Sequence, residues 1–185
     1  MKKYKNQKGS VTLETTIVLP FFILMFLMIF GLFSIVSAQN KISHALVQSS
    51  KSMSLDAYYL ERVSSASEDV TKFWGSLSDA VLDIVRLDND KHFTSRTNWY
   101  SDSEKGAPVA KDRFVGYIAG GDEQKADEIL ESLGVIDGLD GITFKTDITD
   151  DVLTVTINYT LQFVLDAFDM GQIPVEQSIK VKLWK

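Results

Sequence analysis

A run of 26 residues without a charged side chain, from Thr15 to Asn40, constrains this chain more than any other feature. Its centre reads IVLPFFILMFLMIFGLFSIV and is almost wholly apolar. As an α-helix, about 24 such residues would extend roughly 36 Å, which exceeds the ~30 Å hydrocarbon core of a bilayer. A buried helix of a soluble protein is seldom so long and so apolar on every face. The run therefore predicts a single transmembrane helix, which we place at residues 10–38.

The charges on the two sides of this run are unevenly divided. Residues 1–9 form a basic leader that holds four lysines and no acid, whereas the chain beyond residue 40 holds 15 basic and 24 acidic residues. Because short basic segments stay on the cytoplasmic side, we expect a cytoplasmic N-terminus and an extracytoplasmic domain at residues 39–185. With a net charge of about −9, that domain is a poor candidate for binding nucleic acid or anionic lipid, since both attract positive patches.

A cleavable secretory signal is the alternative to a retained span. The sequence VSAQN places Val36 and Ala38 at the two positions that a signal peptidase reads, so that cleavage would leave Gln39 as the first residue. However, the apolar region of such a signal is usually about 7–15 residues long, which is shorter than this run. The signal also gives no reason for Glu14, so we favour a retained membrane span.

Glu14 is the only charged residue between Lys8 and Lys41. A capping box does not explain it, because Val11 occupies the position three residues earlier where Ser or Thr is needed. Two simple explanations are a gain of a few tenths of a kcal/mol from the helix dipole and a location close to the lipid headgroups. The third explanation is a cationic partner, because a charged residue at mid-bilayer costs about 2.5–3.5 kcal/mol, less near the edge, and usually pairs.

Cleavage between Gly9 and Ser10 would supply such a partner. The new α-ammonium group of Ser10 would lie one helical turn from Glu14, which would become the fifth residue of the mature chain. The two charges could then neutralise each other within one chain or between neighbouring subunits. Assembly would then depend on register, since an unpaired charge in lipid is penalised.

The lysine-rich leader, the glycine, SVTLE and the long apolar helix resemble the processing site of type IV pilins and pseudopilins. More closely, KGSVTLETTIVLPFFILMFLMIFGLF resembles the N-terminal segment of TadE-like proteins of tight-adherence (Tad/Flp) pilus systems. Gly9, Glu14, Leu19 and Pro20 match that family's pattern in order. The close similarity covers about residues 8–36, and a weaker likeness lies in the strand-rich C-terminus that ends in KVKLWK.

The resemblance implies a minor pilin or pseudopilin that contributes to a pilus used in adherence or secretion. It implies that a prepilin peptidase cleaves after Gly9 and that Glu14 takes part in subunit assembly. The implied partners are that peptidase, the Tad assembly platform, the major pilin and other minor pilins, with the lipid bilayer around the span. Pro20 is expected to kink the helix, because proline removes one helical hydrogen bond. A membrane-anchored or secreted extracellular binding module is the alternative function.

Apolar periodicity predicts three helical segments after the span. A stalk helix over about residues 39–63 would continue the span, with an apolar stripe at Ile42, Leu46, Met53, Ala57 and Leu60. Two further helices are expected over about residues 67–87 and 122–133, the latter begun by Asp122 and ended by Gly134. We interpret the polar, glycine-punctuated residues 88–121 between them as a loop-rich insertion.

The last third of the chain changes to a period of two. Strands are expected at about residues 142–148, 152–165 and 174–184. One face of the central strand collects large apolar residues and the other carries mostly Thr, Asn and Gln, which predicts an antiparallel meander with one face packed on helices. The apolar face comprises Leu153, Val155, Ile157, Tyr159, Leu161, Phe163 and Leu165, with Val175, Ile179, Val181 and Leu183 on the last strand. The predicted fold class is α+β.

The sequence contains no arrangement typical of catalysis or of cofactor binding. There is no cysteine, and the two histidines, His44 and His92, are not in a metal-ligand spacing. The acidic run from Asp88 to His92 lacks the further ligands and the glycine of a calcium loop. We therefore expect no metal, no cofactor and no enzymatic activity.

Overall fold

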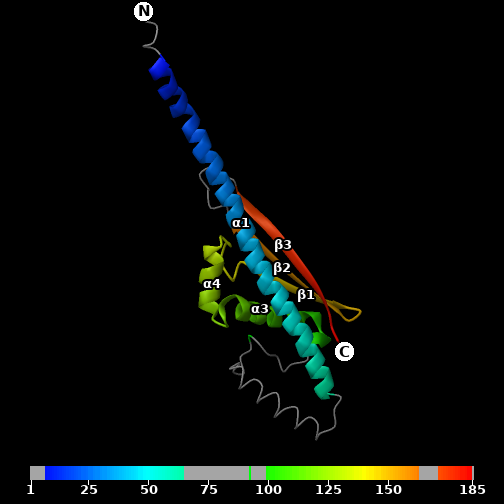
Figure 1. Cartoon of the computed structure of the whole chain (residues 1–185). Coiled ribbons are helices and arrows are strands. Elements are labelled where there is room, and N and C mark those ends of the chain that lie inside the picture. Colours follow the sequence, from blue (N-terminus) through cyan, green and yellow to red (C-terminus); the bar gives the residue numbers. More distant parts are fainter. Residues whose placement is uncertain (1–6, 65–91, 93–98, 163–170, 185) are drawn as a thin grey trace, which may run out of the picture.

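The computed structural model describes residues 7–64, 92, 99–162 and 171–184. One long helix runs past a small domain made of two shorter helices and a three-stranded antiparallel sheet (Figure 1), which confirms the predicted α+β class. The elements are α1 (Gln7–Ser64), a short 3₁₀ helix (Trp99–Ser101), α3 (Ser103–Ala119), α4 (Glu123–Ser132), β1 (Thr143–Thr149), β2 (Val152–Gln162) and β3 (Gln172–Lys182).

Helix α1 is continuous through both the apolar run and the predicted stalk. The sequence favours this continuity, because no glycine–proline break lies between the two parts and the helical apolar period resumes at Ile42. From Ala38 to Ala57 one side of α1 is buried in the domain, and Ile42, Leu46 and Met53 have no exposed surface. The stalk segment is therefore also a core helix of the domain.

The sheet has the strand order β1-β2-β3, and both pairs are antiparallel. Its register aligns Ile148, Leu153 and Val181 across the three strands, with Val155 and Ile179 one step further along the same face. This face packs against α1 and α3, whereas the alternate residues are exposed on β1 and β3 and half-buried on β2. The predicted meander with one packed face is confirmed, and Phe163 and Leu165 lie outside the described residues.

Helix α3 corrects the prediction of a loop-rich insertion at residues 88–121. Asp102 caps its N-terminus by accepting a hydrogen bond from the Glu104 backbone N–H at 3.0 Å, and Gly120 ends it in the left-handed conformation with φ 72°. The apolar face that drives its packing comprises Ala110, Phe114, Val115 and Ile118. Glycine and proline at its start suggested a loop, but tertiary packing of this face outweighs their weak helix propensity.

Helix α4 lies close to its predicted position. The Asp122 side chain accepts from the Lys125 backbone N–H at 3.1 Å, as expected for an N-cap, and Gly134 follows the helix with φ 84°. The helix predicted over residues 67–87 lies outside the described residues.

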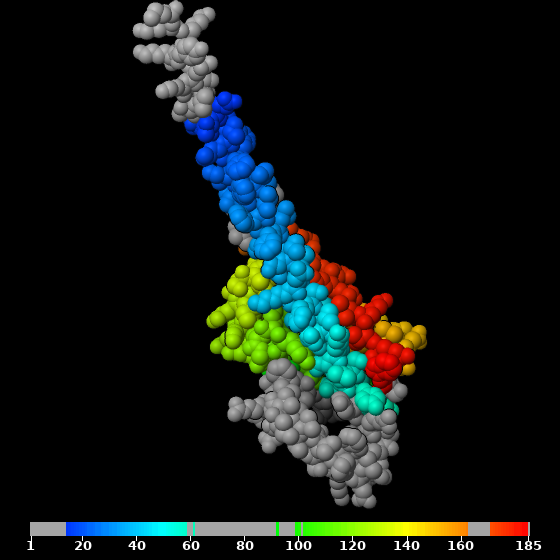
Figure 2. Space-filling view, in the orientation of Figure 1, coloured from blue at the N-terminus to red at the C-terminus, as the bar shows by residue number. Residues whose placement is uncertain are grey.

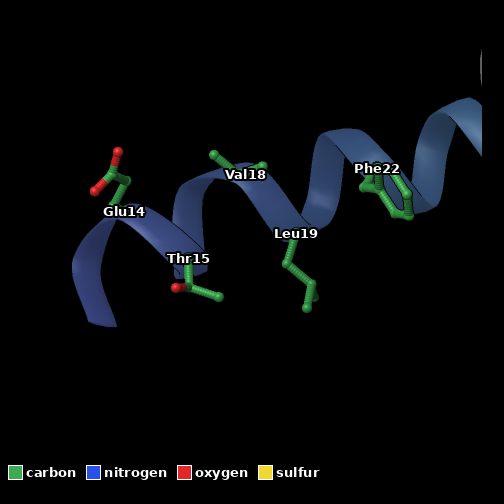
Figure 3. Close-up of a pocket in the computed structure, with 5 residues that line it drawn as sticks. All are labelled: Glu14, Thr15, Val18, Leu19 and Phe22. Carbon is green, nitrogen blue, oxygen red and sulfur yellow. The ribbon is translucent and has the colours of Figure 1, made fainter. Parts of the chain in front are cut away.

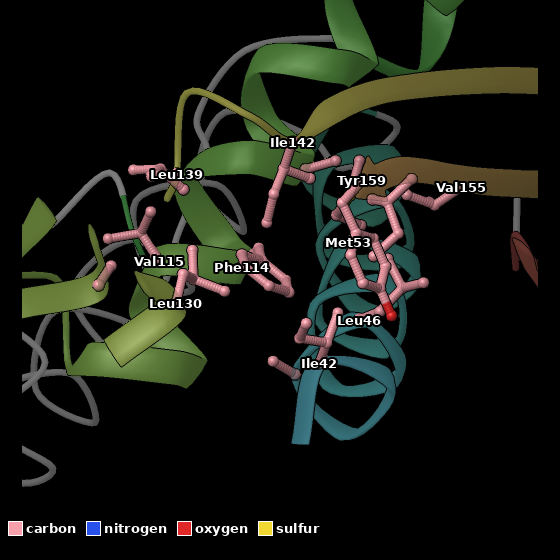
Figure 4. Close-up of a cluster of buried hydrophobic side chains, with 14 of the residues drawn as sticks. Ile42, Leu46, Met53, Phe114, Val115, Leu130, Leu139, Ile142, Val155 and Tyr159 are labelled. Atoms are coloured by element: carbon pink, nitrogen blue, oxygen red, sulfur yellow. The ribbon is translucent and has the colours of Figure 1, made fainter. Parts of the chain in front are cut away.

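The hydrophobic core lies where α1, α3, α4 and the sheet meet. Figure 4 shows Leu46 and Met53 of α1 close to Tyr159 of β2, with Phe114 of α3 between this group and Val115. Phe114 also makes an edge-to-face contact with Phe144 of β1, with ring centroids 5.4 Å apart. The core therefore fixes the domain directly against the second half of α1.

Candidate membrane and assembly site

The first half of α1 projects from the domain with its side chains uncovered. Figure 2 shows this half as a bare rod that extends beyond the packed domain. Every side chain from Glu14 to Phe30 is exposed, and Phe21, Phe30 and Phe33 are among the most exposed apolar residues. Within the described residues, α1 is the one helix long and apolar enough to cross a membrane. A water-exposed surface of this kind is unfavourable, so it requires lipid or other apolar helices around it.

Glu14 lies at the start of this bare surface. Its carboxylate points away from the helix axis, on the same side of α1 as Val18 (Figure 3). Together with Thr15, Leu19 and Phe22 these residues line a shallow depression of about 370 Å³. Because the depression is apolar except for the carboxylate and one hydroxyl, an approaching cation would be held beside an apolar contact surface.

The predicted cleavage site, Gly9 and Ser10, lies in the first turns of α1, two residues after the helix begins at Gln7. The described side chains begin at Glu14, so the structure places only the backbone of these two residues. Helix α1 continues through Pro20 without interruption, and the kink at this position stays a prediction.

A buried ion pair joins the second half of α1 to α3. The Arg113 guanidinium has no exposed surface, and its Nη2 pairs with Asp56 Oδ2 while its Nη1 donates to Ser52 Oγ at 2.8 Å. Burial lowers the pKa of Arg113 to about 10, which leaves it protonated at neutral pH. The pair holds the domain in one register on α1. Sequence reasoning missed Arg113 because α3 was interpreted as loop.

Further polar contacts fasten α1 to the sheet. Ser54 Oγ donates to the backbone oxygen of Lys182 at 2.5 Å, and the Gln177 side-chain amide donates to the Gln39 oxygen at 3.4 Å. These bonds lie at opposite ends of the shared interface, since they are 15 residues apart on α1. The anchor helix and the folded domain therefore form one packed unit.

The two histidines lie apart from the bare surface. His92 is buried, and its Nδ1 lies 2.9 Å from the Asp112 backbone oxygen, while His44 is exposed on α1. Across residues 7–64, 92, 99–162 and 171–184, no three His, Asp or Glu side chains are grouped as metal ligands. The prediction of an enzymatically inactive chain stays untested.

A long apolar N-terminal helix whose second half is built into a small α+β domain defines a class of single-pass, helix-anchored proteins. Residues 9–49 match the family model described as TadE-like protein, so this segment of the chain is similar to that family. The match begins at Gly9, includes Glu14 and Pro20, and ends in the buried stripe of α1 at Ser49. Neither the search of curated proteins nor the search of solved structures yields a match.

Proposed function

We propose that this chain is a minor subunit of a Tad-type pilus, cleaved after Gly9 and assembled through Glu14. The observation that carries the proposal is the exposed Glu14 carboxylate on the bare half of α1, five residues after Gly9, within the TadE-like segment. In this proposal the prepilin peptidase removes the basic leader. The assembly platform, the major pilin and other minor pilins then receive the trimmed helix, and the pilus serves adherence or secretion.

The chemistry of the trimmed helix supports this proposal. Glu14 lies four positions after Ser10, so a new α-ammonium group on Ser10 would lie roughly 6 Å along the helix axis from Glu14. This group can pair with its own Glu14 or with that of a neighbour displaced along the fibre. The depression formed by Val18, Leu19 and Phe22 gives a neighbouring helix an apolar surface beside the charge.

The distribution of charge supports the proposed orientation. The leader holds four lysines, whereas the domain is acidic, so the leader stays cytoplasmic and the domain lies outside. A peptidase on the cytoplasmic side would then reach Gly9 directly.

The packing of α1 supports retention of the helix over cleavage after Ala38. Ala38 has no exposed surface, Ile35 packs against the core, and the Gln39 oxygen accepts from Gln177. Cleavage between Ala38 and Gln39 would cut a continuous helix and remove a core residue. The secreted binding module is therefore the weaker proposal.

Replacement of Glu14 by Gln tests the assembly role in cells that carry the pilus system. We expect the amount of this subunit in sheared pili to fall at least about tenfold, the equivalent of about 1.4 kcal/mol, because the charge pair is lost. Glu128→Gln, which removes an exposed carboxylate of α4 instead, is the matched control and should assemble normally. Unchanged incorporation of Glu14→Gln would show that the carboxylate has no assembly role.

The mature N-terminus tests the processing step separately. Mass spectrometry of the membrane-bound subunit should find Ser10 as the first residue, and Gly9→Val should leave the leader attached. A first residue at Gln39 would instead support the secreted module, and an intact leader in the unmodified chain would contradict cleavage.

A further inference from the structure

The outer face of the sheet is the face turned away from α1 and α3. Side chains that point to this face are exposed on β1 and β3 and half-buried on β2. In the part of the chain that the structure describes, the helices that contact the sheet pack on its other face, which holds the buried residues of β2. The outer face is therefore accessible to a partner.

This outer face also differs in charge from the rest of the domain. The domain carries about −9, whereas the outer-face side chains of the three strands include three lysines and two acids. They are Lys145, Lys180 and Lys182, with Asp147 and Glu176. Two acidic domains repel each other over most of their surface, so a face without net negative charge allows the closest approach of two copies.

The register of the sheet places the charges in rows. Asp147 of β1, Thr154 of β2 and Lys180 of β3 form one row, so an acid and a base lie at its two ends. Lys145, Thr156 and Ser178 form the next outer-face row. Glu176 lies at the β3 end of the row after that, opposite Asn158.

Membrane anchoring restricts how two copies can meet. Strand β3 runs in the direction of α1, since Gln39 contacts Gln177 and Ser54, further along α1, contacts Lys182. Copies inserted in the same direction therefore have their strands in the same direction. A two-fold axis between them must run close to the strand direction, because an axis across the strands would invert one span. Two outer faces related by this axis place β2 against β2, and β1 against β3, at the same height.

We propose that two copies of this chain pack their outer sheet faces against each other about this axis. Asp147 of each copy then lies opposite Lys180 of the other copy. Lys145 lies one row from Glu176 of the other copy, so both pairs bring opposite charges together. The outer face is thus complementary to itself, as a two-fold contact requires.

The centre of the face suits such a contact because its side chains are small. Thr154 and Thr156 lie on the central strand, so each meets its own counterpart near the axis. Aligned sheets pack about 10 Å apart with their strands within about 30° of each other. Thr156 Oγ1 already donates to Ser178 Oγ at 3.1 Å, which satisfies one hydroxyl of this surface within the chain.

The contact is small. Three strands about 4.8 Å apart and seven rows about 3.3 Å apart give roughly 350 Å² per copy, whereas a stable interface buries about 800 Å² per partner. We therefore expect the outer faces to associate between copies that the membrane already confines and orients, and not between free domains. The inference rests on α1 as a membrane span, and on neither cleavage after Gly9 nor the assembly role of Glu14.

Cross-linking between copies tests this contact, because the natural chain has no cysteine. The full chain with Thr156→Cys is reconstituted alone in vesicles of phosphatidylethanolamine and phosphatidylglycerol and treated with a short bis-maleimide. Thr156 lies near the proposed axis, so the two introduced thiols face each other in the dimer. Gln124→Cys, an exposed position on α4, is the control for random collision. We expect a cross-linked dimer from Thr156→Cys and only the collision level from Gln124→Cys.

Charge reversal in the Thr156→Cys chain gives the sharper test. Asp147→Lys sets two ammonium groups against each other at both charge contacts of the dimer, and Lys180→Asp sets two carboxylates there. We expect the cross-linked yield of each variant alone to fall about threefold or more, because like charges replace an attractive pair. A mixture of the two variants, distinguished by tags, should recover the yield as the mixed dimer, since opposite charges then meet at both contacts.

The mixture also separates this contact from an effect on folding, because a misfolded variant is not rescued by a second misfolded variant. Equal cross-linking at Thr156→Cys and Gln124→Cys would overturn the proposal, as would a mixture without recovery. A dimer that forms only when other pilus proteins are present would also overturn it. Since the vesicles contain this chain alone with Gly9 and Glu14 unchanged, the outcome does not depend on whether Glu14 acts in assembly.

Discussion

The two halves of α1 have the same secondary structure and opposite environments. Between Glu14 and Phe33 the side chains are apolar around the whole circumference, and almost all of them are exposed. Between Ala38 and Ala57 the helix is apolar on one side only, and that side is buried in the domain. A helix that is apolar all round needs apolar surroundings on every side, whereas an amphipathic helix buries one side and leaves the other in water.

The side chains on the two contact surfaces also differ in size. The bare half presents Phe, Leu, Ile and Met, and Phe22 and Phe26 make an edge-to-face contact with their ring centroids 4.8 Å apart. The domain half buries several small residues between its larger ones: Ala38, Ala45, Ser49, Ser50, Ser54 and Ala57. Small residues let the helix approach the sheet closely, and Ser49 and Ser50 satisfy their hydroxyls locally by donating to the Leu46 oxygen at 2.8 Å. The small residues are therefore found in the half of α1 that packs closely against the domain.

The largest expected effect comes from breaking the ion pair between Arg113 of α3 and Asp56 in the second half of α1. Arg113→Ala removes the guanidinium that pairs with Asp56 in a largely buried site, so we expect a loss of about 3–5 kcal/mol in unfolding free energy. Denaturant unfolding of the full chain in detergent micelles measures this loss. Lys111→Ala removes the exposed contact with Asp140 and should cost less than about 1 kcal/mol. Equal losses for both variants would contradict the assigned importance of burial.

Truncation of one leucine in each half tests the comparison directly. Leu46 has no exposed surface, so Leu46→Ala should destabilise the domain by about 2–4 kcal/mol, because it leaves a cavity in the core. Leu27→Ala, on the bare half, should leave domain unfolding unchanged in the same micelles. A comparable loss of unfolding free energy from Leu27→Ala would show that the bare half of α1 also packs on the domain.

Ser54→Ala tests the contribution of one hydrogen bond between the second half of α1 and β3. The variant leaves the Lys182 carbonyl oxygen without the hydroxyl that donates to it, so we expect a loss of about 1–2 kcal/mol. The measurement is the same unfolding titration. Ser43→Ala, on a half-buried position of the same helix, serves as control and should shift the midpoint by much less.

The smallest expected effect concerns Tyr159, which packs near Met53 in the core. Burial raises the pKa of Tyr159 to about 12 from its ordinary value of 10.0. The unfolded chain therefore loses this proton first, so the stability contributed by neutral Tyr159 is full below about pH 10 and is lost as the pH rises toward 12. Tyr159→Phe should remove that loss and be about 1 kcal/mol more stable than the natural chain at pH 11, relative to their difference at pH 8.

Burial also lowers the pKa of Arg113, to about 10, so this group can contribute its own pH dependence in the same range. Comparison of Tyr159→Phe with the natural chain cancels this contribution, since Arg113 is present in both. A pH dependence identical in the two proteins would show that Tyr159 ionises freely in the folded state.

Much of the fold is readable from local patterns. The period of two at Leu153, Val155 and Ile157 predicts a strand with one packed face, and the register confirms it. Asp122 and Gly134 mark the ends of α4 because capping depends on neighbouring backbone groups.

Helix α3 is not predicted from the sequence, because Gly106 and Pro108 weaken its start, although Ala110, Phe114 and Ile118 have helical spacing. At Gly106 the absence of a Cβ is required, since one would lie 2.6 Å from Thr146 Oγ1.

By itself, the sequence determined the long apolar helix, the spacing of Gly9 and Glu14, and the similarity of this segment to the TadE-like family. These features depend on residues close together in the chain, so composition and spacing are sufficient. Only the tertiary structure decided that Arg113 pairs with Asp56, 57 residues away, and that β3 packs along the second half of α1, where Ser54 donates to the Lys182 carbonyl oxygen. Such contacts depend on how separate elements pack in three dimensions, and a local hydrophobic period does not specify which distant residues meet.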